Sequence, residues 1–114
     1  MDERKRRLGL NEAMFREVNE RVEDLTQTFD STTETIEIFC ECGDTTCTER
    51  LSVPIAEYER VRGDATHFLL HAGHEDPTVE RVIEIHDTYV IAEKEGVDVE
   101  RVVEETDPRS SGSK

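Results

Sequence analysis

The sequence predicts an α+β domain, in which an N-terminal amphipathic helix packs on a small antiparallel sheet of two hairpins, with short additional helices. Three observations predict it. Apolar residues recur at helical spacing before residue 30, apolar and polar residues alternate from residue 35, and turn residues separate the later apolar runs. The chain has 114 residues, enough for one domain. We divide it into a flexible basic arm (1–8), a single domain (9–106) and a disordered tail (107–114).

The first element is a helix from about residue 11 to residue 29. Asn11 suits its start, because an asparagine side chain can accept the free amide hydrogens of a first helical turn. The apolar side chains predict a face packed on the core, and the charged side chains predict a solvated opposite face. The apolar residues are Met14, Val18, Val22, Leu25 and Phe29, and the charged residues are Glu17, Glu20, Arg21 and Asp24. The polar run DSTTET (30–35) ends the helix.

A hairpin follows the helix. Apolar and polar residues alternate from Thr35, with Ile36, Ile38 and Cys40 on one face, which predicts a strand. A second strand over 48–53 completes the hairpin. A short helix then begins at the proline of the run VPIAEYERVRG and ends at its last glycine.

The sequence pattern in the second half of the domain predicts a further hairpin. An extended run over 68–71 leads into it, and the apolar runs 79–85 and 89–92 form its strands around the tripeptide HDT. A helix over 77–86 would also suit the pattern, but β-branched side chains favour strands. Asp98 can cap a last short helix that carries three valines at helical spacing.

The charge of the chain limits its partners. The net charge is −14 and 37% of residues are charged, so direct nucleic-acid binding is disfavoured and attraction to a basic protein surface is favoured. The four basic residues 4–7 form a short arm. We expect no membrane span and no secretory signal, and therefore a cytoplasmic protein with reduced thiols.

All three cysteines lie in the nine-residue run FCECGDTTC. Alternation in a strand places Cys40 and Cys42 on one side, and the turn after them brings Cys47 back. Zinc takes four tetrahedral ligands, and three cysteines with one histidine are a common set. Of the four histidines, His74 is our first choice for the fourth ligand, because the Gly-His loop around it can bend toward the cysteines. His71 is the second choice. The domain 9–106 is therefore predicted to be zinc-stabilised, with a zinc-binding hairpin tip.

Two other interpretations of the cysteines are weaker. A redox thiol needs a low pKa, whereas acidic residues surround these cysteines, at positions 37, 41, 44 and 49, and acidic neighbours raise a thiol pKa. Burial as small apolar groups would explain one or two cysteines beside a polar turn, but not three. A closed Cys3His set leaves no position for a substrate, so the predicted zinc holds the fold.

Two clusters of histidine and acid suit acid-base or metal-assisted chemistry. They are His74, Glu75 and Asp76, and His86 with Asp87. Their spacing matches no motif with a defined mechanism, and we expect His86 and Asp87 to form a hairpin turn. We assign no catalytic residue.

Five runs carry a resemblance along nearly the whole chain: LGLNEAMFREVNERVEDL, FCECGDTTCTERL, AEYERVR, GHEDPTVERV and EETDPRS. The chain resembles a group of small actinobacterial proteins that have no assigned activity. The pattern of that group includes three cysteines and a Gly-His step, matched here at Cys40, Cys42, Cys47, Gly73 and His74. The resemblance implies one recurring domain and no particular chemistry.

These observations favour a small acidic, zinc-stabilised interaction or regulatory module that is not an enzyme and binds a basic protein surface. The alternative is a small metalloenzyme or thiol-based redox regulator that uses the cysteine cluster.

Overall fold

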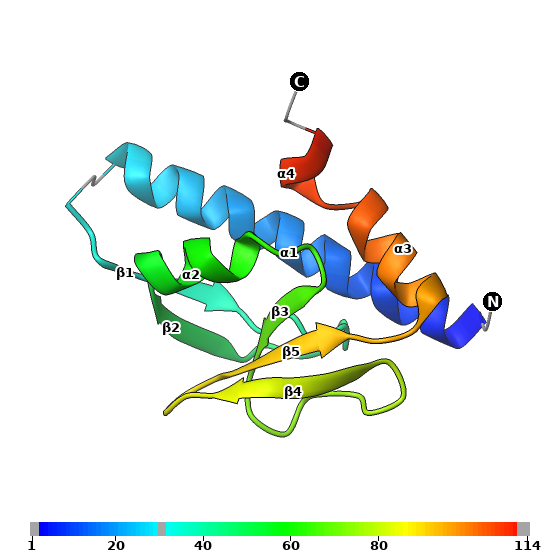
Figure 1. Cartoon of the computed structure of the whole chain (residues 1–114). Coiled ribbons are helices and arrows are strands. Elements are labelled where there is room, and N and C mark those ends of the chain that lie inside the picture. The colour runs from blue at the N-terminus through cyan, green and yellow to red at the C-terminus, as the bar shows by residue number, and fades with distance from the viewer. Residues whose placement is uncertain (1–2, 30–31, 112–114) are drawn as a thin grey trace.

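The computed structural model describes residues 3–29 and 32–111 of the chain. It has the predicted α+β class, with one long N-terminal helix, short strands and further short helices (Figure 1). The elements are, in chain order, α1 (Glu3–Phe29), β1 (Thr35–Phe39), β2 (Arg50–Pro54), α2 (Ile55–Arg62), β3 (His67–Leu70), β4 (Glu80–Ile85), β5 (Val90–Lys94), α3 (Val97–Glu105) and α4 (Pro108–Ser111).

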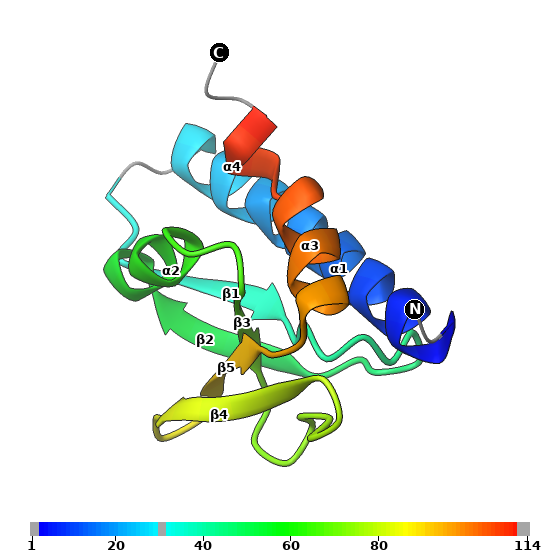
Figure 2. The same ribbon diagram turned by 45° about the vertical axis from the view of Figure 1, so that its right-hand side comes forward.

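The strands form two antiparallel sheets rather than one. Strands β1 and β2 pair as the predicted first hairpin, with Ile36 opposite Val53 and Ile38 opposite Leu51. The second sheet has the order β3-β5-β4, so the extended run before the second hairpin joins it as an edge strand. Helix α1 runs along the molecule above the sheets, and α3 lies beside it (Figure 2).

The second hairpin confirms the strand prediction over the competing helix. Strand β4 ends before the HDT turn, and β5 returns antiparallel to it. Two details differ from the predictions. Helix α3 begins after Gly96, not at an Asp98 cap, and β2 starts two residues later than the predicted 48–53 strand, because the chain after Cys47 is still part of the loop.

Helix α1 starts earlier than predicted. It begins at Glu3, so residues 3–8 of the predicted arm are helical, and Asn11 is not its cap. The Asn11 side chain instead donates a hydrogen bond to the carbonyl oxygen of Gly43. Within the predicted tail, residues 108–111 form the short helix α4. Residues 1–2 of that arm, 112–114 of that tail and 30–31 of the predicted helix end lie outside the described residues.

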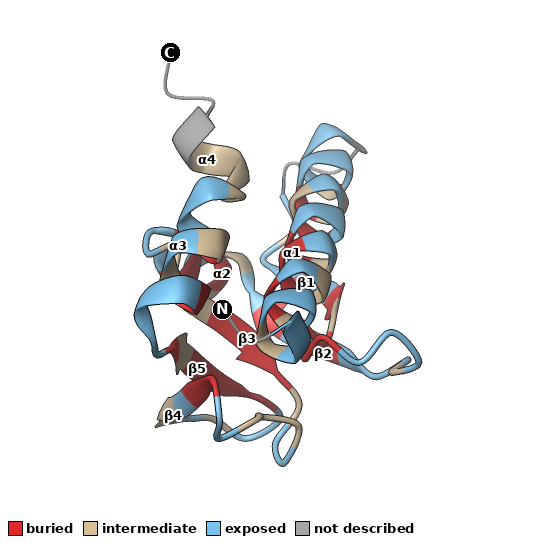
Figure 3. Ribbon diagram, turned by 90° about the vertical axis from the view of Figure 1, so that its right-hand side faces the viewer, coloured by how far each residue is buried: buried red, intermediate tan, exposed pale blue. Residues whose placement is uncertain are grey.

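The predicted core face of α1 is wrong. Met14 is 51% exposed and Leu25 is 58% exposed, and Val18 is also exposed, whereas Val22 is only partly buried. The buried face instead carries mostly polar side chains, which are Glu12, Arg16, Asn19 and Glu23 together with Ala13. A polar side chain can be buried where a partner compensates its lost hydration, and other elements supply those partners. Figure 3 shows the exposed outer turns of α1 in pale blue.

The predicted alternation along β1 is confirmed, since its apolar face is buried. This face leads from one apolar cluster into another. Ile36 and Ile38 pack in a cluster with Leu51, Val53 and Tyr58. Cys40 and Cys42 continue into a second cluster, together with Phe68, Leu70, Val90, Ala92 and Val103. The cysteines therefore lie where apolar core meets the loops.

Candidate metal centre

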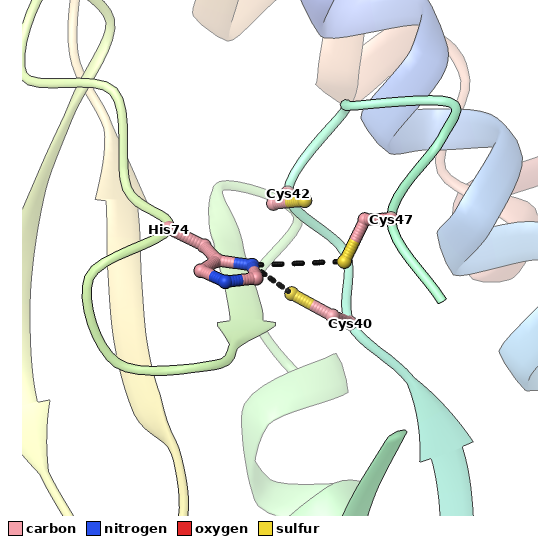
Figure 4. A group of neighbouring side chains, drawn as sticks. All are labelled: Cys40, Cys42, Cys47 and His74. Carbon is pink, nitrogen blue, oxygen red and sulfur yellow. Dashed lines mark hydrogen bonds between the residues drawn. The ribbon is translucent and has the colours of Figure 1, made fainter. Parts of the chain in front are cut away.

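Two loops bring four side chains together at one end of the sheets. Cys40, Cys42 and Cys47 lie in the loop that joins β1 to β2, and His74 lies in the loop that joins β3 to β4 (Figure 4). One ligand atom from each of the four lies within 4.8 Å of the others. Three cysteines from the β1–β2 loop thus lie beside one histidine from the β3–β4 loop, and the four side chains are close enough to bind a metal ion.

The separations between ligand atoms fit a tetrahedral ion. His74 Nδ1 lies 3.5 Å from Cys40 Sγ and 3.6 Å from Cys47 Sγ. In a tetrahedral zinc site with Zn–S of about 2.3 Å and Zn–N of about 2.0–2.1 Å, the sulfur and nitrogen are about 3.6 Å apart. The imidazole therefore presents Nδ1, not Nε2, to the sulfurs.

His71, the second choice for a fourth ligand, lies beside this group and not in it. Its backbone N–H donates a hydrogen bond of 3.2 Å to Cys40 Sγ, and its ring centroid lies 4.9 Å from that of His74. Its Nε2 faces Glu49 at 3.9 Å. A backbone donor of this kind stabilises a thiolate, so His71 contributes through its main chain.

The thiols differ in acidity. A hydrogen bond from the Cys40 thiol lowers the pKa of Cys42 to about 5. The same shared proton, followed by burial, raises the pKa of Cys40, and burial raises that of Cys47. The expectation that acidic neighbours would raise every thiol pKa is wrong for Cys42, since the hydrogen bonds to its sulfur outweigh burial. Binding of a metal cation would favour the deprotonated form of all three thiols.

Glu41, between the first two cysteines, faces the opposite side of the chain. Its buried carboxylate accepts hydrogen bonds from both terminal nitrogens of Arg62, at 2.7 and 2.9 Å, from Asn19 Nδ2 at 2.7 Å and from the backbone N–H of Leu69 at 3.0 Å. Its own N–H donates to the carbonyl oxygen of Leu69. These bonds fix the backbone between Cys40 and Cys42 against β3.

The alternation along β1 already places Glu41 on the face opposite Cys40, and the structure confirms this orientation. From the sequence, Glu41 has no role beyond that of an acidic neighbour of the thiols. The partners of Glu41 are not visible from that pattern. Asn19 comes from α1 and Arg62 from the end of α2, both distant in sequence.

Helix α1 holds the cysteine loop at two points. The Asn19 side chain donates to the carbonyl oxygen of Phe39 and accepts from its N–H, both at 2.8 Å. At the turn, Gly43 has φ +81°, and a Cβ there would lie 2.5 Å from a carbon of Leu8 and 2.8 Å from one of Glu12. Only glycine fits so close an approach of the loop to the helix.

Buried charged side chains hold the loop that contains His74 in place. The Asp76 N–H donates to Glu80 at 2.7 Å, and Glu80 is paired with Lys94, which is also paired with Glu12 of α1. Glu12 and Lys94 are fully buried, and the Lys94 ammonium lies 5.1 Å from the centroid of the Phe68 ring. Burial raises the pKa of Glu12 well above its usual range. Both candidate ligand loops are thereby connected to α1.

The other histidine and acid groups are engaged elsewhere. Asp76 accepts hydrogen bonds from Thr78 and pairs with Arg4, so its carboxylate does not face the cysteines as a ligand. His86 lies in the turn after β4, where its N–H donates to the carbonyl oxygen of Tyr89 and its ring stacks on the Tyr89 ring. His74 and His86 therefore lie at opposite ends of β4 and form no common site.

Two further groups of possible ligands come together on the surface, Glu57 with Glu84 and His86, and Asp64 with His67 and Glu93. Arginines already bind three of the four carboxylates. Arg60 contacts both Glu57 and Glu84 at 2.7 Å, and Arg81 contacts Glu93 at 3.1 Å. A metal ion would have to displace these cations, so the cysteine group is the better candidate.

Comparison of the chain with protein-family models, with curated proteins and with solved structures finds no match. The resemblance to small actinobacterial proteins stays a prediction. Within residues 3–29 and 32–111, no helix is both long enough and apolar enough to span a bilayer.

Proposed function

We propose that Cys40, Cys42, Cys47 and His74 bind one structural zinc ion. The observation that carries this proposal is the spacing of 3.5 and 3.6 Å between His74 Nδ1 and two of the sulfurs, which matches the edge of a zinc tetrahedron. Three sulfurs and one imidazole are soft ligands that suit zinc far better than magnesium or calcium. The set is closed, and a closed set supports structure rather than catalysis.

The zinc ion would join the two sheets. Three of its ligands follow β1 of the first sheet, and the fourth precedes β4 of the second. Only 34% of the residues are hydrophobic, and a small domain with a thin core commonly relies on a metal or disulfide for stability. Binding of the ion would therefore contribute directly to the free energy of folding.

A chelation experiment tests the structural role. Zinc-loaded protein is unfolded thermally with and without EDTA, and the transition is followed by far-UV circular dichroism. We expect the melting temperature to fall on chelation and to recover when zinc, but not magnesium, is added back. An unchanged melting temperature in EDTA, with the metal shown to be removed, would contradict the proposal.

The domain held by this ion is, in our proposal, an interaction or regulatory module that binds a basic protein surface and is not an enzyme. The net charge of −14 supports this, because a strongly acidic surface attracts basic partners and repels phosphate backbones. Immobilised zinc-loaded protein should retain basic proteins from a native lysate at low salt and release them at high salt. Retention of no basic protein at low salt would count against the module.

A second candidate, a thiol-based redox regulator, is favoured by two observations together. The pKa of Cys42 is lowered to about 5, which favours the reactive thiolate. The neighbouring Cys47 is partly exposed, whereas Cys40 and Cys42 are 2% and 6% exposed. In that case peroxide would oxidise two thiolates to a disulfide, would itself be reduced to water, and zinc would be released. A colorimetric zinc-release assay separates the candidates. Fast zinc release by micromolar peroxide supports the regulator, and slow zinc release supports the structural site.

A further inference from the structure

One face of α1 carries exposed apolar side chains that the fold does not use. We call Leu10, Met14, Val18 and Leu25 the apolar stripe. Their exposed fractions run from 37% to 58%, and they lie on the helix face opposite the buried side chains of Glu12, Arg16, Asn19 and Glu23. Figure 3 shows this outer face uncovered along the helix.

The apolar stripe runs along the helix axis with one charged position in it. Leu10, Met14 and Val18 follow one another at intervals of four residues, and the exposed Arg21 lies between Val18 and Leu25. With a rise of about 1.5 Å per residue, the stripe extends over about 22 Å. Exposed apolar side chains that gather on one helix face commonly mark an interaction site.

The charges of α1 differ from those of the rest of the chain. Residues 3–29 contain six basic and six acidic side chains, so the helix is neutral in a chain of net charge −14. Residues 3–14 carry a net charge of +2 and residues 15–29 carry −2. Two such helices are therefore complementary when they lie antiparallel, and they repel at both ends when they lie parallel.

We propose that the apolar stripe binds the same stripe of a second copy of this chain, giving a two-fold symmetric dimer with antiparallel α1 helices. This arrangement places Leu10 of one copy beside Leu25 of the other, and it places Arg21 of each copy near Glu17 of the other. The same residues serve both copies, as a two-fold interface requires. The dimer goes beyond the proposed function and does not depend on the metal.

A second copy suits this face better than the basic partner proposed above. A basic protein would be attracted to the acidic surface outside α1, because the helix itself offers no net negative charge. A neutral helix instead lets two acidic molecules approach with less repulsion than an acidic surface would. The zinc module and the dimer can thus fail independently of each other.

The first test uses substitutions that leave the charge unchanged. Sedimentation velocity of the zinc-loaded full chain should show a dimer at micromolar concentration. The double variant M14Q with L25Q should be mostly monomeric, and the dissociation constant of its dimer should rise at least about tenfold. The control variant I85Q with V97Q removes two other exposed apolar residues, which are 81% and 74% exposed and lie outside α1. It should dimerise as the wild type does. A monomeric wild type, or equal effects of the two variants, would overturn the proposal.

The second test addresses the antiparallel pairing. The variants R21E and E17R should each weaken the dimer, because each brings like charges together across the two-fold axis. Mixed in equal amounts, the two variants should form a heterodimer, since the acidic pair of one then faces the basic pair of the other. Circular dichroism confirms that each variant is folded. Failure of the mixture to associate while wild type dimerises would overturn the antiparallel arrangement.

Discussion

Glu41 and Arg62 form a buried bidentate ion pair, with N–O distances of 2.7 and 2.9 Å. In the sequence, Glu41 stands between two of the candidate zinc ligands, Cys40 and Cys42. The pair joins the end of α2 to the backbone of the cysteine loop. The geometry of the candidate metal centre is therefore set partly by a residue whose side chain faces away from the cysteines. Removing one member leaves the other charge buried without its partner.

The variant E41A should lose about 3–5 kcal/mol of stability, because the Arg62 guanidinium stays buried without its counter-charge. Urea unfolding of the zinc-loaded protein measures the loss. The matched control is E84A, which removes a partner of Arg60 in a surface ion pair, and this should cost at most about 1 kcal/mol. Similar losses in both variants would show that the buried pair has no special role.

Substituting Gly43 tests the packing of the cysteine loop on α1. The variant G43A should lower both stability and zinc affinity, because the added methyl group would overlap Leu8 and Glu12 and because φ +81° is strained for alanine. The control G96A has a similar backbone requirement, with φ +113°, but no atom lies within 4 Å of its added carbon. We expect G96A to lose stability from strain alone, of order 1–3 kcal/mol, and to keep its zinc affinity. Equal zinc affinities in the two variants would contradict this account of the loop.

Removing the Lys94 ammonium should destabilise the protein, because two buried carboxyl groups pair with it. The variant K94M leaves the carboxyl groups of Glu12 and Glu80 buried without a cation, and we expect a loss of about 3–5 kcal/mol. Adding E12Q should recover part of that loss, because it removes one of the two uncompensated acids. A double-mutant cycle measured by urea unfolding tests this, and strictly additive effects would contradict the coupling.

Glu23 should make the protein less stable at alkaline pH. Burial, with a hydrogen bond to Glu59, raises the pKa of Glu23 from 4.5 to about 8, although Arg109 opposes this. A raised folded-state pKa means that the folded form holds the proton more tightly. Its contribution to stability is complete below about pH 4.5 and is lost as pH rises through about 8.

The measurement is the melting temperature of wild type and E23Q between about pH 6 and pH 9, since glutamine copies the protonated side chain. Wild type should lose more stability over this interval than E23Q. The control is E104Q, which changes an exposed glutamate. Its melting temperature should change with pH as that of wild type does. Parallel curves for wild type and E23Q would show that Glu23 does not titrate in this range.

The sequence predicted the strands and the grouping of the cysteines better than the orientation of α1. Strand faces followed from alternation, because Ile36, Ile38 and Cys40 are buried by apolar neighbours of the sheets. On α1 the apolar pattern pointed to Met14 and Leu25, which are exposed. The core instead takes polar side chains whose partners come from distant segments, and hydrophobic periodicity contains no information about such pairs.

The sequence reduces the choice of the fourth ligand to two histidines, with His74 first and His71 second. Both His71 and His74 lie near the Gly-His loop, and spacing cannot show which ring reaches the cysteines. The loop is held through Asp76 and Glu80, which is paired with Lys94, and this anchoring leaves His74 facing the sulfurs. Such tertiary contacts decide ligand geometry, and the spacing of residues in the sequence contains no information about them.

The most direct test of the zinc proposal is the metal content of wild type, H74A and H71A, purified without added metal and measured by inductively coupled plasma mass spectrometry. We expect one equivalent of zinc in wild type and in H71A, since the backbone N–H of residue 71 is retained, and a clear loss of zinc from H74A. Wild-type protein without stoichiometric zinc, or equal zinc contents in H74A and H71A, would contradict the proposed centre.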